Sequence, residues 1–390
     1  TGRGCDDRTM RTPLCDRLGI EFPIFAFSHC RDVVAAVSRA GGFGVLGAVA
    51  FTPEQLEIEL DWIDEHVGDK PYGVDIIVPA KYTGIEQGGL TRKDLAAMIP
   101  DEHRQFVDEL MRRYGVEELP ADETTPRRGG GSDDVMGFSH ESGHRLLEVV
   151  WAHPKVRLVA NALGPAPDFL VTEAHDRGVL VAGLVGTVVH AERQQAAGVD
   201  LIIAQGSEAG GHTGEIGTMV LVPQVVDAVA PTPVLAAGGI ADGRQIVAAL
   251  ALGAQGVWCG SVWLTTEEAE THPVVKEKFL AATSADTIRS RAKTGKPARQ
   301  LRSAWTDEWS DPANPAPLGM PLQMVLVGEA EQRIARTAAS NEGSRRLINY
   351  FVGQAVGQMN TTKTAAQQVF DFVEQYLEAA DRIASTIAED

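Results

Sequence analysis

Residues 199–260 of the chain read VDLIIAQGSEAGGHTGEIGTMVLVPQVVDAVAPTPVLAAGGIADGRQIVAALALGAQGVWCG. This stretch contains three short apolar runs, at Val199–Ala204, Val234–Ala237 and Gly256–Gly260. Two segments with helical periodicity separate them, Val220–Val229 and Gly243–Leu252. Short apolar strands that alternate with helices are typical of a parallel sheet covered by helices.

The same alternation extends upstream, and no strand is followed directly by a hairpin turn. Five further strands are predicted, at Phe22–Phe27, Gly44–Ala48, Tyr72–Val78, Val156–Ala160 and Val179–Val185. The helices predicted with them are Asp32–Ala40, Pro53–His66, Ser142–Ala152, Pro167–Arg177 and Val188–Ala197. Eight strand–helix units predict an α/β fold of the closed (β/α)8 TIM-barrel type, for which about 250 residues are typical. A doubly wound open sheet remains the alternative, because parallel order does not by itself close a barrel.

Two long segments interrupt this alternation, 79–150 after the third strand and 271–346 after the eighth. We therefore expect a barrel made of 13–270 plus 347–390, with 79–150 as an insertion within it, and a small helical lid domain made of 271–346. The polar, glycine-rich stretch 121–134 is expected to be a mobile loop. The last segment has one apolar helical face, which predicts a helix that closes the barrel or, alternatively, an oligomer contact. This face consists of Val369, Val373, Leu377, Ala380, Ala384 and Ile387.

The composition restricts the class of partner. The 390 residues include 53 acidic and 35 basic side chains, which gives a formal net charge of −18. Such a surface repels nucleic acid and anionic lipid, so we expect a small-molecule substrate, no nucleic acid and no membrane. The apolar runs are too short to span a bilayer, and no signal-peptide core is visible near the start. Four cysteines far apart without a CxxC pair favour a reduced, cytoplasmic protein.

The most informative motif is Ala204–Gly214, AQGSEAGGHTG, which follows an apolar strand and so belongs at the mouth of the barrel. Gly210 and Gly211 let the backbone approach a flat ligand closely, and His212 projects beside it. An imidazole with a pKa near 6.5 can take or give a proton at neutral pH. We predict that His212 is a catalytic acid or base; a loop histidine that caps a backbone group is the alternative.

Glycines at the ends of the last two predicted strands indicate a phosphate site. Gly238 and Gly239 follow the seventh strand, and Gly260 and Ser261 follow the eighth. In TIM barrels these loops commonly bind one phosphate monoester through backbone N–H groups. No GxGxxG follows the first strand, which speaks against a dinucleotide. The alternative is that these glycines only form strand-end turns.

Three further residues face the predicted mouth. His29 is a candidate second acid or base, and Cys30 lies near a predicted helix N-terminus that could lower its pKa. Asp75 could accept a hydrogen bond from a bound ring or could be a packed or solvated aspartate.

A basic cluster between 289 and 302 interrupts the acidic background. It could meet an anionic substrate or the tail of a coenzyme-A ester, although a solvated surface is the default interpretation. Its members are Arg289, Arg291, Lys293, Lys296, Arg299 and Arg302. The histidines show no metal-type spacing, so no metal site is predicted.

In sequence order, five motifs resemble the nitronate monooxygenase family, formerly called 2-nitropropane dioxygenases: AQGSEAGGHTG, TMVLVPQVVDAV, AAGGIADGR, ALGAQGVWCGSVWL and TGKPAR. The resemblance implies an FMN-binding TIM barrel in which His212 is the catalytic base and a small helical lid follows the eighth strand. It assigns the FMN phosphate to Gly238, Gly239, Gly260 and Ser261. It assigns the flavin ring to Gln205, Gly210 and Gly211, with Ala26, Phe27 and Ser28 at its edge and Asp75 beside it.

Two departures from the family pattern lie where substrate and flavin would meet. Ala26-Phe27-Ser28 stands where the family usually has Ala-Pro-Met, and Asp75 stands where it usually has asparagine. The implied reaction is oxidation of an alkyl nitronate with molecular oxygen. The alternatives are a flavin-dependent reductase or hydroxylase for an acyl thioester, similar to enoyl-acyl-carrier-protein reductases, and a non-catalytic barrel that binds a phosphate ligand. A homo-oligomer is compatible with either enzyme.

Overall fold

A computed structural model describes residues 10–49, 51–78, 90–118, 140–162 and 164–386. Eight parallel strands form a closed barrel in the order β1-β2-β3-β4-β5-β6-β8-β9. Closure is explicit, because Phe25 of β1 pairs with Trp258 of β9 as well as with Phe43 of β2. The predicted TIM barrel is therefore confirmed, and the open sheet is excluded. The strands are β1 Ile24–Ser28, β2 Phe43–Gly47, β3 Tyr72–Ile76, β4 Val156–Asn161, β5 Leu180–Val185, β6 Leu201–Gln205, β8 Val234–Ala237 and β9 Gly256–Cys259.

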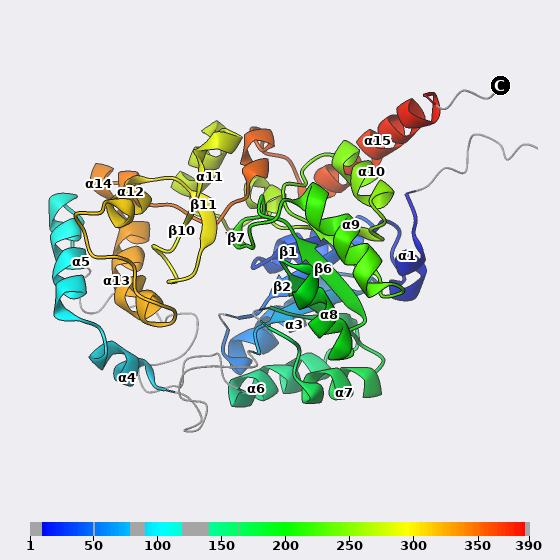
Figure 1. The fold of residues 1–390 in the computed structure, drawn as a ribbon, viewed down its shortest axis with the longest axis horizontal. Coiled ribbons are helices and arrows are strands. Elements are labelled where there is room, and N and C mark those ends of the chain that lie inside the picture. Colours follow the sequence, from blue (N-terminus) through cyan, green and yellow to red (C-terminus); the bar gives the residue numbers. More distant parts are fainter. Residues whose placement is uncertain (1–9, 50, 79–89, 119–139, 163, 387–390) are drawn as a thin grey trace, which may run out of the picture.

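Helices surround the barrel in the order that the sequence predicts (Figure 1). Local signals explain several boundaries: Thr52 caps α3 in a reciprocal capping box, and Asp242 caps α10. The covering helices are α2 Arg31–Arg39, α3 Pro53–His66, α6 His140–Trp151, α7 Asp168–Asp176, α8 Val188–Ala196, α9 Thr218–Val229, α10 Gly243–Ala251 and α15 Ala365–Ala384.

Two apolar cores hold the barrel together. The lumen is filled by inward side chains at alternate strand positions, such as Phe25, Phe43 and Trp258. Leu14 and Cys15 of the short helix α1 (Pro13–Leu18) belong to the same core, so α1 plugs the end away from the mouth. The second core lies between strands and helices, and Phe372 of α15 is buried in it. Because α15 packs on α10 and α2, its prediction as the closing helix is confirmed.

A second body stands beside the barrel, at the left in Figure 1. It contains α11 Pro273–Ala281, α12 Ala304–Ser310, α13 Leu322–Thr337, α14 Glu342–Leu347 and the short helix η4 Gln354–Gln358. It also contains antiparallel strands, which the expectation of a purely helical lid missed. These are β10 Thr287–Ser290 and β11 Ala298–Leu301, and β11 pairs with a two-residue strand, β7 Gly211–His212, from the barrel's own loop.

The insertion after β3 joins this second body. Its helices α4 (Arg92–Ala97) and α5 (Asp101–Arg113) pack against α13, and Phe106 and Leu110 lie in the same core as Trp305 and Val327. Two distant insertions therefore share one core. The stretch 121–134, expected to be a loop, lies outside the described residues.

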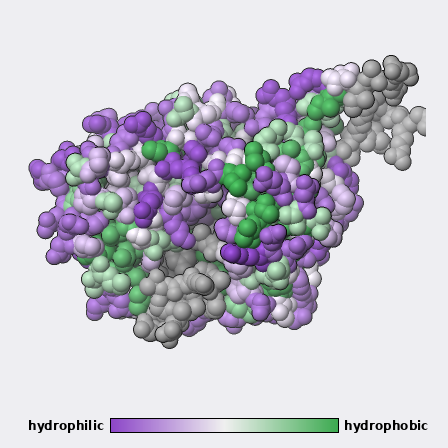
Figure 2. Space-filling model, viewed as in Figure 1, coloured by the Kyte–Doolittle hydropathy of each residue, from purple (hydrophilic) through white to green (hydrophobic). Residues whose placement is uncertain are grey.

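The surface is rich in hydrophilic side chains, as the content of charged residues predicts. Figure 2 shows a mostly hydrophilic face with hydrophobic side chains gathered over α9, where Met219 and Val220 are exposed. No helix among the described residues combines the length and the apolar character that crossing a bilayer requires.

Candidate functional site

A cavity of about 1860 Å³ lies at the carboxyl ends of the barrel strands. The barrel contributes Phe27 and Trp258, and the second body contributes Met320 and Met324 to its walls. Every predicted site residue lines this cavity except Ala26, which is fully buried in the core between strands and helices. The lining set from the sequence is Phe27, Ser28, Asp75, Gln205, Gly210, Gly211, His212, Gly238, Gly239, Gly260 and Ser261.

The loop that carries His212 is fixed by both bodies. Within the barrel, the Ser207 amide donates to the carbonyl of Ile216 at 2.8 Å. From the second body, Arg299 Nε donates to the Ser207 carbonyl at 2.9 Å, and the Gln354 amide donates to the Glu208 carbonyl at 2.8 Å. The β7–β11 pairing then fixes the direction of the loop at His212 itself. Such a support holds the His212 side chain more tightly than a free loop would.

The imidazole of His212 is oriented by a backbone carbonyl. Its Nδ1 lies 3.4 Å from the carbonyl oxygen of Pro297, so Nδ1 carries the proton and Nε2 keeps its lone pair. Burial lowers the pKa of His212 below its ordinary value, and the Lys296 ammonium lowers it further against the opposing effect of the Pro297 hydrogen bond. Both causes favour the neutral imidazole at neutral pH, which is the form that can accept a proton.

The strand ends β8 and β9 form a glycine cradle. Gly238 and Gly239 have φ of +108° and +72°, a region that residues with a side chain rarely adopt. Ser261 Oγ accepts a 2.8 Å hydrogen bond from the Gly353 amide, and its own proton remains able to donate. The carboxylate of Glu208 already occupies the N-terminus of α9, where it accepts from the amide and the hydroxyl of Thr218. The N-terminus of α9 is therefore already occupied by a carboxylate of the chain itself.

Asp75 is an unusual group in the cavity wall. It lies at the mouth end of β3 and is only 6% exposed, and its carboxyl has no hydrogen-bond partner in the part of the chain that the structure describes. Burial raises the pKa of Asp75 to about 8. The group is therefore mostly protonated at neutral pH, so it can donate a hydrogen bond to a ligand as well as accept one.

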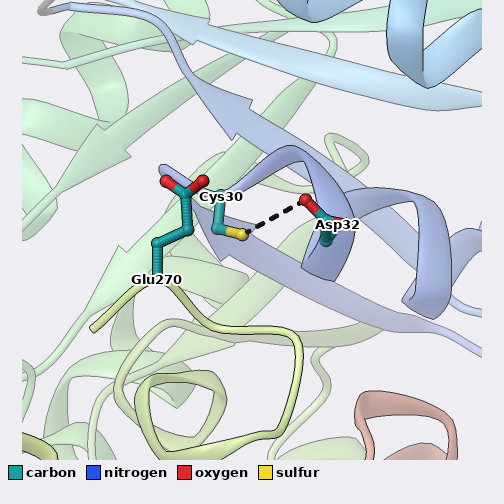
Figure 3. A group of neighbouring side chains, drawn as sticks. All are labelled: Cys30, Asp32 and Glu270. Carbon is teal, nitrogen blue, oxygen red and sulfur yellow. Dashed lines mark hydrogen bonds between the residues drawn. The ribbon is translucent and has the colours of Figure 1, made fainter. Parts of the chain in front are cut away.

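Cys30 differs from the expectation of a lowered pKa. Burial raises the pKa of its thiol, and Sγ donates to the Glu268 carbonyl at 3.1 Å. The helix N-terminus does not compensate for the loss of water, so this residue stays a thiol. Figure 3 shows Cys30 beside Asp32 and Glu270. The other candidate, His29, holds the Gly47 carbonyl through Nδ1 at 2.8 Å and packs edge-on against Phe27.

Most of the basic cluster supports the fold rather than facing a ligand. Arg299 and Arg289 donate to carbonyl oxygens of the loop around His212, those of Ser207 and Thr213. Lys293 and Lys296 do line the cavity. Lys293 pairs with Glu331 at 2.6 Å, whereas Lys296 is exposed and has no ion-pair partner among the described side chains. Sequence reasoning missed the role of the two arginines, because their partners are backbone atoms 76 and 92 residues away.

Comparison with known proteins identifies the family and agrees with the fold. The sequence profile of the nitronate monooxygenase family matches residues 11–375. A relative from Mycobacterium tuberculosis named "Putative monooxygenase Rv1533" is 59% identical, over 97% of this chain and 100% of its own length. The crystal structure of a nitroalkane oxidase from Streptomyces ansochromogenes superimposes with a TM-score of 0.76 at 26% identity, covering 95% of this chain and 99% of that one. FabK from Thermotoga maritima superimposes with a TM-score of 0.68 at 28% identity, covering 97% and 100%.

The closed barrel, the matching family profile and the nitroalkane oxidase neighbour define the class of the protein, an oxidoreductase. The match over nearly the whole length identifies the particular group: the chain belongs to the nitronate monooxygenase family of flavoenzymes.

Proposed function

We propose that this protein binds FMN in the mouth of the barrel and oxidises alkyl nitronates with molecular oxygen, with His212 as the catalytic base. The observation that carries the proposal is the placement of His212. Its imidazole lines a cavity that also contains the glycine cradle, and its Nδ1 is turned away toward the Pro297 carbonyl. Nε2 is therefore the nitrogen available to a substrate.

The residues present fit FMN. Gly238, Gly239, Gly260 and Ser261 offer backbone N–H groups and one hydroxyl to a single phosphate, which suits a mononucleotide. The carboxyl of Asp75 has no hydrogen-bond partner among the described residues although it is only 6% exposed, so it is a candidate partner for a polar edge of the ring. Gln205, Gly210 and Gly211 are candidates to line the ring, with Phe27 and Ser28 at its edge.

The chain's own contribution is orientation and proton transfer. When bound, oxidised FMN supplies the electron acceptor for the nitronate, and oxygen is the terminal oxidant. His212 Nε2 would take the α-proton of a neutral nitroalkane, and the resulting imidazolium would stabilise the nitronate anion. The exposed Lys296 ammonium lies near enough to act on the His212 pKa and adds positive charge beside that anion. The second body, as a lid, would exclude water from the reaction.

An acyl thioester is the second candidate substrate. The structural similarity to FabK and the two lysines in the cavity wall, Lys293 and Lys296, support it. Oxygen uptake with propyl nitronate in the absence of NADH tests the first candidate. NADH-dependent turnover of an enoyl thioester without such uptake would favour the second. Cytoplasmic location and homo-oligomer formation remain predictions.

A further inference from the structure

We propose that Glu57, Asp61 and His153 form a binding site for a divalent transition-metal ion, for which Zn²⁺ fits the donor set. Their ligand atoms all lie within 4.8 Å of one another. The site does not depend on the proposed flavin chemistry, because none of the three residues lines the cavity.

Two helices bring these residues together. Glu57 and Asp61 are four residues apart on α3 and so share one face of that helix. His153 follows α6, which packs against α3, and it precedes β4. The site therefore lies near the start of β4, the end of the barrel opposite the mouth. Groups at this end of such barrels generally serve stability rather than catalysis.

The imidazole of His153 is oriented for metal binding. Its Nδ1 lies 2.7 Å from Asp64 Oδ2, while the hydroxyl of Tyr72 donates to Asp64 Oδ1 at 3.1 Å. Burial raises the pKa of Tyr72, so that hydroxyl stays protonated and remains a donor. Asp64 thereby fixes the tautomer of His153 with the proton on Nδ1, and the lone pair of Nε2 is left for another partner. A carboxylate that holds a histidine in this way is the usual second partner of a metal-bound imidazole.

His153 Nε2 is a buried polar atom without a hydrogen-bond partner among the described residues. The His153 side chain is 5% exposed, and Nε2 makes no hydrogen bond to the described residues. The nearest carboxylate oxygen, Glu57 Oε2, lies at 3.9 Å, which is too long for a hydrogen bond. Two ligands of a tetrahedral Zn²⁺ lie about 3.4 Å apart when each bond is about 2.1 Å. An ion at this site would therefore draw both exposed acids inward; for Glu57 the movement is about half an ångström.

The charges and the donor types agree with a cation. Two exposed carboxylates face the buried nitrogen, and Asp61 has no ion pair or hydrogen bond among the described residues. One imidazole with two carboxylates suits Zn²⁺ better than Mg²⁺, which prefers oxygen ligands alone. An ion bound here would link α3 to the start of β4 and would stabilise the folded state. The group formed by Cys30, Asp32 and Glu270 in Figure 3 is a weaker candidate. Its buried ligand atom, the Cys30 sulfur, already donates a hydrogen bond to the Glu268 carbonyl.

Competition against a chromophoric chelator tests the proposal on the purified full-length protein after treatment with EDTA. We expect one Zn²⁺ per chain, with an affinity that falls at least about tenfold in Glu57→Gln and in Asp61→Asn, while Mg²⁺ competes poorly. Glu65→Gln, an exposed acid on the same helix, is the matched control and should bind like the wild type. A rise in Tm with Zn²⁺ in the wild type, absent in Asp61→Asn, is the second expected result.

Two results would overturn the proposal. The first is wild-type affinity in both Glu57→Gln and Asp61→Asn. The second is loss of the Zn²⁺ site in Cys30→Ser, which would move the ion to the group of Figure 3. His153→Gln is the variant of the third proposed ligand. If burial of the new side chain prevents this variant from folding, Glu57→Gln and Asp61→Asn still decide the question.

Discussion

Replacement of Arg299 by alanine should loosen the loop that presents His212. Arg299 is 9% exposed and joins β11 to this loop through Nε and the Ser207 carbonyl, and it joins β11 to β10 through Nη1 and Thr287 Oγ1 at 3.0 Å. Each hydrogen bond from a charged donor contributes about 1.5–3 kcal/mol. Burial and the neighbouring Arg289 lower the pKa of Arg299, so its removal also relieves an unfavourable charge. We expect a net loss of about 2–4 kcal/mol in the free energy of unfolding.

Two measurements check this expectation. For a chain of 390 residues, 2–4 kcal/mol corresponds to a fall of about 2–5 °C in Tm. Hydrogen exchange should rise across 206–214 more than in the barrel strands, because local openings follow local contacts. Nitronate turnover should fall as His212 loses its fixed position.

Arg302→Ala provides the matched control. Arg302 lies one residue beyond β11, and its side chain is 65% exposed in an ion pair with Asp307. An exposed pair of this kind contributes at most about 1 kcal/mol. Equal effects of Arg299→Ala and Arg302→Ala on Tm and on exchange in 206–214 would refute the idea that Arg299 holds the loop.

Three further predictions concern the cavity. His212→Asn should retain the flavin spectrum and lose at least about 100-fold in kcat/KM with a neutral nitroalkane. The wild-type profile should show a loss of activity as pH falls through a pKa below 6.5, because protonation removes the base, and the variant should lack this limb. An unchanged profile would remove His212 from proton transfer. In the flavin-free wild type, the raised pKa of Asp75 contributes stability at low pH that is lost as pH rises from about 4, the pKa in the unfolded chain, to about 8, the pKa in the folded protein. Asp75→Asn lacks this loss. Its free energy of unfolding should therefore rise relative to the wild type by up to about 1.4 kcal/mol per pH unit over that range. Chemical unfolding at several pH values measures this, and a gain independent of pH would contradict it. Gly210→Ala should weaken flavin retention, because its Cβ would lie 2.8 Å from the backbone of Gly353; Gly68→Ala, strained only by its φ of +69°, should retain the flavin.

The barrel was predictable because its signals are local. Each predicted strand overlaps the observed one, and the ends differ by at most two residues, since apolar alternation and capping residues lie next to one another in the sequence. The cavity residues followed from the strand ends, because parallel strands place their carboxyl ends at one mouth. Ala26 was assigned to the mouth from sequence but faces the core between strands and helices, because alternate residues of β1 point to opposite sides.

Features that depend on distant contacts were not predictable. The strand β7 has two residues, and it exists only because β11 pairs with it. Helices α4 and α5 carry no sequence signal for packing on α13. The pKa of Cys30 depends on burial by segments far along the chain, which outweighs the nearby helix N-terminus. Likewise, spacing along the chain could not associate His153 with Glu57 and Asp61.

The most direct test of the account is the visible spectrum of the purified protein under anaerobic conditions, before and after addition of propyl nitronate without NADH. The account predicts a flavin that is released as FMN on denaturation and that is bleached by the nitronate, with colour restored by oxygen. A colourless protein, or a flavin that is bleached only by NADH, would contradict it.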